Sequence, residues 1–248
     1  MRAVATSRRS GDDVGRSLAL LRAFRVEQTD PDRFYGLLAE DSADLVSSFT
    51  RLEGQCVLDV GAGPVQFAEA FHTRGARYVA VDHDECALTR CPLPDAAAVV
   101  ASGQHLPFPD ASVDVAFSSN VFEHVRRPQR LGDEMVRVTR PGGLVVVAYT
   151  NWLSPWGGHE TSPFHYLGGQ QAVERYRRRY GHAPKNQVGV NLFRVSVAAG
   201  LHWARTQPSA VLLEARPRYY PRWTRALLVL PGVREVATWN LLLVLRRT

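Results

Sequence analysis

The sequence predicts an α/β fold built on a mostly parallel sheet, and three observations lead to that class. Short apolar runs alternate with helical segments along most of the chain, which is the pattern of βαβ units. A glycine-rich turn joins an apolar run to a helical segment in "VLDVGAGPVQFAEAF" (Val57–Phe71). The continuous apolar run Leu144–Tyr149 is typical of a strand buried on both faces.

The predicted elements alternate along the chain after two N-terminal helices. Those helices fill Ser17–Phe49 and are separated at Asp30-Pro31, because Asp30 suits an N-cap and Pro31 suits the first helical position. Later helices are predicted at Pro64–Thr73, Glu85–Thr89, Pro128–Thr139 and Asn191–Gly200. Strands are predicted at Gln55–Val60, Tyr78–Val81, Ala97–Ala101, Val113–Ser118, Leu144–Tyr149, Val211–Glu214 and Asn240–Leu245.

The length of 248 residues fits one α/β domain with insertions. Residues 1–16 are polar and contain no apolar signal-peptide core, so we expect a disordered tail followed by a single domain at 17–248. Two segments, at about 150–190 and 216–238, exceed the α/β pattern. Long insertions of this kind often carry function.

Composition excludes several classes of protein. Cys56, Cys86 and Cys91 form no CxxC pair, which argues against a disulfide framework or a zinc site and favours a reducing cytoplasm. No apolar run has the roughly 18 residues of a membrane span. The net charge is +6, with basic clusters at Glu174–Tyr180 and Ala215–Arg225 that suit solvated faces, an anionic substrate or an acidic membrane surface. Since no nucleic-acid motif accompanies them, nucleic acid is not an expected partner.

The glycine turn marks a candidate ligand site at the carboxyl end of the first strand. Gly61 and Gly63 permit positive φ angles and close approach of a ligand to the backbone. Asp82 ends the next strand, about 20 residues later, where a carboxylate can accept hydrogen bonds from both hydroxyls of a ribose. The alternatives are a tight turn without a ligand at the glycines and a simple helix cap at Asp82. The coincidence of the glycine turn with Asp82 favours a ligand site.

Four motifs in order give the chain a family resemblance. They are "VLDVGAGP", "YVAVDHD", "HLPFPDASVDVAFSSNVFEHV" and "RVTRPGGLVVVAY", and they run over Cys56–Tyr149. With them the chain resembles a class I S-adenosylmethionine-dependent methyltransferase of the methyltransferase type 11 kind. The resemblance implies a Rossmann-like α/β sandwich of seven strands with the last pair antiparallel, N-terminal helices over the cofactor, and a lid insertion.

The resemblance also implies roles for individual residues. Asp59 matches the acidic residue that supports the amino group of the cofactor, Asp82 matches the ribose ligand, and Asn120 lies near the sulfonium. Two positions depart from the family pattern, because Val65 replaces a frequent third glycine and Ser102 replaces an acidic residue that binds adenine. The complete set of expected cofactor contacts is Asp59, Gly61, Ala62, Gly63, Asp82, His83, Ser102, Gly103, Gln104 and Asn120.

The acceptor side of such an enzyme needs an aligned nucleophile and, for a hydroxyl acceptor, a proton acceptor. Glu123 and His124 follow the fourth strand, and the aromatic loop Asn151–Gly169 carries His159 and His165. Neutral histidine serves as a base near pH 7, so these four residues are the catalytic candidates, with His159 or His165 preferred. An ordered lid whose histidines only cap turns is the structural alternative.

The sequence therefore predicts S-adenosylmethionine-dependent methylation, on oxygen, of a small-molecule, glycan or lipid-linked glycan acceptor. Aromatic and basic residues beside Ala226–Leu230 favour a peripheral contact of this cytoplasmic protein with the inner face of the membrane, although a helix packed on the sheet edge explains them equally. Carbon or nitrogen acceptors, and a non-catalytic cofactor-binding scaffold or partner-binding module, stay open. Gln66 at the third glycine position disfavours an NAD enzyme. No metal is predicted, because His159, Glu160 and His165 match no zinc motif.

Overall fold

The computed structural model describes residues 10–25, 30–89 and 97–248. Its sheet has seven strands in the order β3-β2-β1-β4-β5-β7-β6. Strands β1 to β5 pair in parallel, and β7 runs antiparallel to both β5 and β6. The strand bounds are Cys56–Val60 (β1), Arg77–Asp82 (β2), Ala97–Val100 (β3), Val113–Ser119 (β4), Thr139–Thr150 (β5), Ala210–Pro217 (β6) and Asn240–Arg247 (β7). The predicted mostly parallel sheet with an antiparallel last pair is confirmed.

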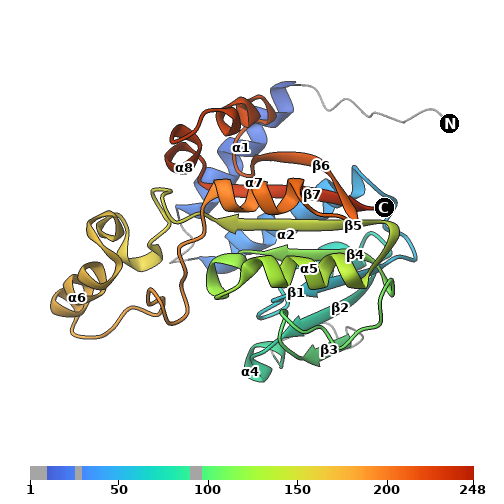
Figure 1. Ribbon diagram of the computed structural model, residues 1–248, viewed down its shortest axis with the longest axis horizontal. Helices are drawn as coiled ribbons and strands as arrows, with labels where there is room; N and C mark the ends of the chain where they lie inside the picture. The colour runs from blue at the N-terminus through green and yellow to red at the C-terminus, as the bar shows by residue number, and fades with distance from the viewer. Residues whose placement is uncertain (1–9, 26–29, 90–96) are drawn as a thin grey trace.

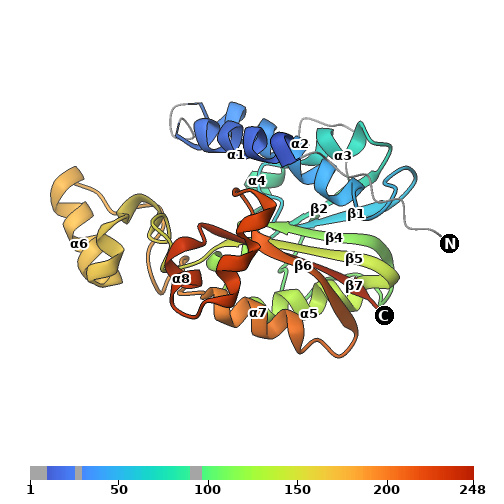
Figure 2. The same ribbon diagram turned by 90° about the horizontal axis from the view of Figure 1, so that it is seen from above.

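Helices cover both faces of this sheet, so the domain has three layers (Figure 2). One face carries α1 (Ser10–Phe24), α2 (Pro31–Ser47) and α3 (Ala68–His72), and the other carries α5 (Pro128–Val138) and α7 (Val197–Arg205). The short α4 (Glu85–Leu88) follows β2. Alternate strand residues fill two separate apolar cores between these layers, as expected for strands buried on both faces.

The carboxyl ends of the parallel strands meet at one edge, and both long insertions lie beyond it (Figure 1). The first insertion, residues 151–194, is called the lid below, and it contains η2 (His159–Thr161), η3 (Phe164–Leu167) and α6 (Gly169–Tyr180). The second contains η4 (Arg222–Val229) and α8 (Val233–Ala237). No helix in the described ranges has both the length and the apolar character to cross a membrane.

The N-terminal helix begins earlier than the sequence predicted. It starts at Ser10, so residues 10–16 of the expected disordered tail are helical, while residues 1–9 lie outside the described part. The reason is a tertiary contact, because Arg16 forms an ion pair with Asp41 of α2 and donates to the carbonyl of Arg218 at 3.0 Å. Local polarity did not reveal this anchor.

Two other helices begin later than predicted. Helix α3 starts at Ala68 rather than Pro64, because the preceding turn continues through Val65, whose φ of 59° is incompatible with a right-handed helix. Helix α7 starts at Val197 rather than Asn191, because the side chain of Ser196 caps it by accepting from the backbone N–H of Ala199 at 3.0 Å.

The packing of α5 against α7 gives a test of this fold. A Cβ atom on Gly132 would lie 2.2 Å from Trp203 Cζ2, and the Trp203 indole is held by a 2.9 Å hydrogen bond to Asp133. We therefore expect Gly132→Ala to lower the free energy of unfolding by roughly 1–3 kcal/mol through overpacking, measured by urea denaturation.

The matched control is Gly36→Ala in α2. Gly36 is exposed, and an added Cβ meets no atom within 4 Å. This change should raise the free energy of unfolding by about 0.5–1 kcal/mol. Equal stability of Gly132→Ala and the wild type would contradict the α5–α7 contact.

Candidate active site

The turn after β1 forms one wall of the candidate site. Gly61 and Gly63 have φ angles of 80° and 52°, which glycine adopts without strain. A Cβ on Gly61 would lie 2.4 Å from Val121 Cγ2, whereas a Cβ on Gly63 would meet no atom within 4 Å. Gly61 is thus required for the packing of Val121, and Gly63 is the glycine that borders open space.

Asp82 braces this turn from the end of β2. Its Oδ2 accepts from the backbone N–H of Gly63 at 2.8 Å, and its Oδ1 accepts from that of Asp84 at 2.9 Å. Because each carboxylate oxygen has a second lone pair, Asp82 can accept further hydrogen bonds from ribose hydroxyls. The neighbouring His83 points outward, with a side chain that is 88% exposed.

The segment after β3 lies beside Asp82. The backbone N–H of Ala101 donates to the Asp82 carbonyl at 2.9 Å. Ser102 is exposed, and its hydroxyl accepts from the backbone N–H of Gln104 at 3.3 Å. A Cβ on Gly103 would lie 2.8 Å from Val60 Cγ1, so glycine lets this segment pack against the end of β1. The three residues expected to face adenine therefore adjoin the expected ribose ligand.

Val65 occupies the position where the family often has a third glycine. Its φ of 59° lies in the left-handed region, which β-branched residues rarely adopt. The side chain is buried, and the backbone N–H donates to the carbonyl of the buried Ala62 at 3.0 Å. The turn therefore keeps the backbone conformation that glycine favours, while the side chain joins the core.

Asp59 is buried behind the glycine turn, with 1% of its surface exposed. Burial raises the pKa of its carboxyl group to about 7, and the Tyr78 hydroxyl opposes this rise by donating a hydrogen bond to Oδ2. The charge of Asp82 adds to the rise. A nearby ammonium group would favour the ionised form of Asp59, which is the chemistry expected of the residue that supports the cofactor's amino group.

Asn120 follows β4 at the same edge of the sheet. Its backbone N–H donates to the Ala148 carbonyl at 2.7 Å, and its side-chain oxygen accepts from Asn240 Nδ2 at 2.7 Å. These bonds connect the ends of β4, β5 and β7. They hold Asn120 at a φ of 59°, a conformation that asparagine tolerates better than most residues.

Three of the four catalytic candidates come together beside Asn120. Glu123, His124 and His159 each place one side-chain nitrogen or oxygen within 4.8 Å of the other two. The two imidazole rings lie 5.0 Å apart in an edge-to-face arrangement. This group, called the Glu–His cluster below, combines η1 (Phe122–His124) with the lid.

Glu123 is the buried member of the cluster, with 1% of its surface exposed. Its Oε1 accepts from the backbone N–H of Thr150 at 2.9 Å, while Oε2 is buried and has no hydrogen-bond partner. Burial raises the pKa of this carboxyl group, and the nearby His124 opposes the rise. A raised pKa makes the carboxylate a stronger proton acceptor.

The two cluster histidines are oriented differently. Nδ1 of His124 lies 2.8 Å from the carbonyl oxygen of Asn191; since a carbonyl only accepts, Nδ1 carries the proton and Nε2 can accept. His159 has a φ of 49°, and its Nε2 is buried without a partner. Burial is the main reason that its pKa falls to about 3, so the ring is neutral at physiological pH.

His165 does not join the cluster. It is buried inside the lid, where Nε2 lies 3.2 Å from the Ser154 carbonyl and the ring packs on Trp152 and Tyr166. This position suits a residue that stabilises the lid. Glu160 is also outside the Glu–His cluster. Its carboxylate accepts from Asn186 Nδ2 at 3.1 Å.

Sequence reasoning missed a buried cation at the same edge. Arg218 is 1% exposed and donates to the hydroxyls of Ser119 at 2.7 Å and Ser42 at 2.6 Å, while its Nε has no partner. Among the described residues no carboxylate forms an ion pair with it. The basic cluster Ala215–Arg225 predicts a solvated face, an anionic substrate site or a membrane surface. In the structure β6 extends through Pro217, and Arg216 and Arg218 are buried.

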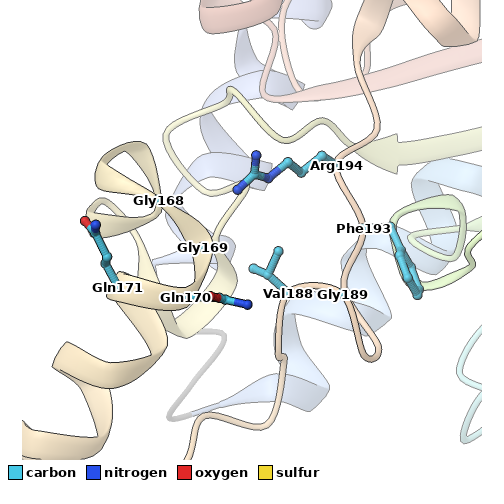
Figure 3. A pocket seen from close by; sticks show the side chains of 8 residues that line it. All are labelled: Gly168, Gly169, Gln170, Gln171, Val188, Gly189, Phe193 and Arg194. Atoms are coloured by element: carbon cyan, nitrogen blue, oxygen red, sulfur yellow. The ribbon is translucent and has the colours of Figure 1, made fainter.

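An open pocket of about 540 Å³ lies in the lid. In Figure 3 the side chains of Gln170, Val188 and Arg194 point toward one another across it. Phe193, at its edge, donates its backbone N–H to the Glu123 carbonyl at 2.7 Å, so the pocket wall is tied directly to the cluster. The lining residues are Gly168, Gly169, Gln170, Gln171, Val188, Gly189, Phe193 and Arg194.

A seven-stranded sheet with a glycine turn and an acidic tip at the carboxyl ends defines a nucleoside-binding α/β protein, and comparisons with known proteins make the class more specific. Residues 58–147 match the family described as a methyltransferase domain. Over 245 residues the chain is 54% identical to an uncharacterized methyltransferase of Mycolicibacterium gilvum (strain PYR-GCK), with 95% of each chain covered. The chain therefore belongs to the methyltransferases, as the motif resemblance predicted.

Two solved structures share the fold. An S-adenosylmethionine-dependent methyltransferase from Mesorhizobium loti has a TM-score of 0.58 at 19% identity, covering 84% of this chain and 98% of that chain. The [4+2]-cyclase SpnF has a TM-score of 0.55 at 17% identity, covering 84% and 81%. At these identities the likeness shows the fold alone, and the cyclase illustrates that one fold serves more than one reaction.

The position of Asp82 predicts its contribution to cofactor binding. We expect Asp82→Ala to weaken S-adenosylmethionine binding by roughly 1–3 kcal/mol, because polar partners lose a buried acceptor, as measured by calorimetric titration. Asp84→Ala removes a neighbouring carboxylate that caps α4 and should bind the cofactor like the wild type. Unchanged affinity in Asp82→Ala would show that the ribose lies elsewhere.

The raised pKa of Asp59 predicts a pH-dependent stability. Its folded-state pKa of about 7 exceeds the ordinary value near 4, so the folded protein binds the proton more tightly. The contribution of Asp59 to stability therefore falls as pH rises from about 4 to 7 and stays low above that. Relative to the wild type, Asp59→Asn should be more stable at pH 8 than at pH 5 in urea unfolding. If the difference in stability between Asp59→Asn and the wild type does not change with pH, the raised pKa of Asp59 is contradicted.

Proposed function

We propose that this methyltransferase transfers a methyl group from S-adenosylmethionine to a hydroxyl oxygen, and that the Glu–His cluster receives that hydroxyl. Two observations carry this proposal. Glu123, His124 and His159 each place one side-chain nitrogen or oxygen within 4.8 Å of the other two, and Glu123 Oε2 and His159 Nε2 are buried without a hydrogen-bond partner. A hydroxyl donor satisfies such atoms. This location adjoins Asn120, the residue that the family resemblance puts near the sulfonium.

The residues present fit the cofactor. Gly63 borders open space, Asp82 has lone pairs for the ribose hydroxyls, and Ser102 to Gln104 adjoin it for adenine. Arg218 supports this assignment with a buried positive charge that no carboxylate of the described residues neutralises by an ion pair. We assign it to the carboxylate of the methionine moiety, because buried charges are normally paired.

S-adenosylmethionine supplies an activated methyl carbon on a sulfonium; as the C–O bond forms, the C–S bond breaks, its electron pair stays on sulfur, and S-adenosylhomocysteine leaves. The protein's task is alignment and proton removal. Glu123, whose pKa is raised by burial, is our proposed proton acceptor. His159, whose ring is neutral, and His124 orient the hydroxyl toward the methyl carbon.

The acceptor class follows from the surroundings of the cluster. The lid pocket combines apolar surface from Val188 and Phe193 with polar groups from Gln170 and Arg194, a mixture that suits the apolar face and the hydroxyls of a sugar ring. Exposed apolar residues lie on η4, where Trp223 is 69% and Val229 is 76% exposed. Their position next to Arg222 and Arg225 supports a peripheral contact with an anionic membrane and hence a lipid-linked glycan.

The test follows radiolabel from methyl-tritiated S-adenosylmethionine into cell extract that has been separated into soluble metabolites, glycans and lipids. We expect transfer into the glycan or lipid-linked fraction. Glu123→Gln should lower the rate about 10²-fold or more, as for loss of a general base, without loss of cofactor affinity.

Glu160→Gln is the matched control, because Glu160 lies on the lid but outside the cluster. It should transfer label at the wild-type rate. Cofactor binding without transfer to any fraction would favour the non-catalytic scaffold, and full activity of Glu123→Gln would place the proton acceptor elsewhere.

A further inference from the structure

We propose that Glu123, His124 and His159 bind a divalent first-row transition-metal ion, with Zn²⁺ as the first candidate, between the end of β4 and the lid. The three donor atoms lie within 4.8 Å of one another. Ligands of a tetrahedral zinc ion, at about 2.0–2.1 Å, lie roughly 3.3 Å apart. The distances between the donor atoms therefore have to shorten by roughly 1.5 Å at most for zinc to bind. One of the three ligands, His159, lies on the lid.

The donor set selects the class of metal. Two imidazoles and one carboxylate are the protein ligands of many catalytic zinc sites and of non-haem iron sites. Magnesium and calcium prefer oxygen ligands throughout, so the two histidines disfavour them. Glu123 and His124 are adjacent in sequence, but His159 follows only in the lid, which is why no local zinc motif is visible.

The outer contacts of the cluster already orient two ligands. Glu123 uses Oε1 to accept from Thr150 N–H at 2.9 Å, which leaves Oε2 free. His124 donates from Nδ1 to the carbonyl of Asn191 at 2.8 Å, which leaves Nε2 free. Metal-binding histidines typically donate their other N–H to a carbonyl or carboxylate in this way.

The buried, unpartnered atoms are the second and independent indication. Glu123 is almost wholly buried, yet its Oε2 has no hydrogen-bond partner. The Nε2 atom of His159 is also buried and has no hydrogen-bond partner. An ionised carboxylate oxygen and an imidazole nitrogen without its proton are both acceptors, so in that state the two atoms do not satisfy each other. A cation between them satisfies both at once, and buried polar groups without partners are uncommon in folded proteins.

Three protein ligands leave at least one coordination position open. On the basis of the proposed function, we infer that the acceptor hydroxyl occupies it. Coordination to a divalent ion lowers the pKa of a bound hydroxyl. With the ion bound, Glu123 acts as a ligand in place of the proton acceptor, and the proton of the hydroxyl leaves to water before the oxygen attacks the methyl carbon. The metal site itself is argued from the cluster alone and does not depend on this step.

The test is a calorimetric titration of the full chain with Zn²⁺ after treatment with a chelator, repeated with Co²⁺ while its visible absorption is recorded. We expect one ion per chain and Co²⁺ bands that indicate mixed nitrogen and oxygen ligands. His159→Ala and Glu123→Gln should each lower the affinity at least about 10²-fold, since removing a ligand costs at least as much as removing an outer contact.

Two controls make the result specific. His182→Ala removes an exposed imidazole that does not belong to the cluster, and it should bind Zn²⁺ like the wild type. Retained S-adenosylmethionine binding in His159→Ala would show that the variant is folded. The proposal fails if Zn²⁺ and Co²⁺ do not bind specifically, or if the cluster variants bind them as tightly as the wild type.

The proposed function is tested separately. Methyl transfer that persists at full rate in excess chelator would overturn the role of the metal in methyl transfer but leave oxygen methylation by the cluster intact. Metal binding without any methyl transfer would overturn oxygen methylation by the cluster but leave the metal site intact.

Discussion

The buried carboxylate of Glu123 is the contact on which the acceptor side of the molecule depends. Its Oε1 holds the end of β5 through Thr150, and its backbone carbonyl holds the lid through Phe193. The same residue follows β4 by way of η1. Three segments from distant parts of the sequence are therefore fixed around one side chain, whose second oxygen is left buried and unpartnered. Such an arrangement is costly unless something binds there.

The cofactor side is built differently, from backbone rather than from convergent side chains. Gly63 and Asp82 are joined directly, and the segment after β3 hydrogen-bonds to the end of β2. These contacts lie at successive strand ends, the usual ligand-binding edge of a parallel sheet. The two halves meet at Asn120 and Val121, where Val121 packs on Gly61. In the proposed function, the strands therefore set the position of the methyl donor, while the lid contributes His159 to the acceptor side.

Local patterns predicted what local physics determines. The strand runs, the glycine turn and Asp82 at a strand tip could all be recognised because each has a sequence signature within a few residues. His159 was singled out by its setting, but its separation from His165 depends on how the lid folds back on η1, which no periodicity records. The burial of Arg218 and the early start of α1 are likewise tertiary effects, since Arg16 and Arg218 are 202 residues apart and yet hydrogen-bonded.

The most direct test of the central claim, that the donor and the Glu–His cluster face each other across the ends of β4 and β5, is a crystal structure of the complex with S-adenosylhomocysteine. The account predicts the ribose on Asp82 and the sulfur directed toward Asn120, with Glu123 and His159 on the side from which an acceptor approaches. A sulfur directed away from the cluster, or a cofactor bound in the lid pocket near Gln170, would contradict it.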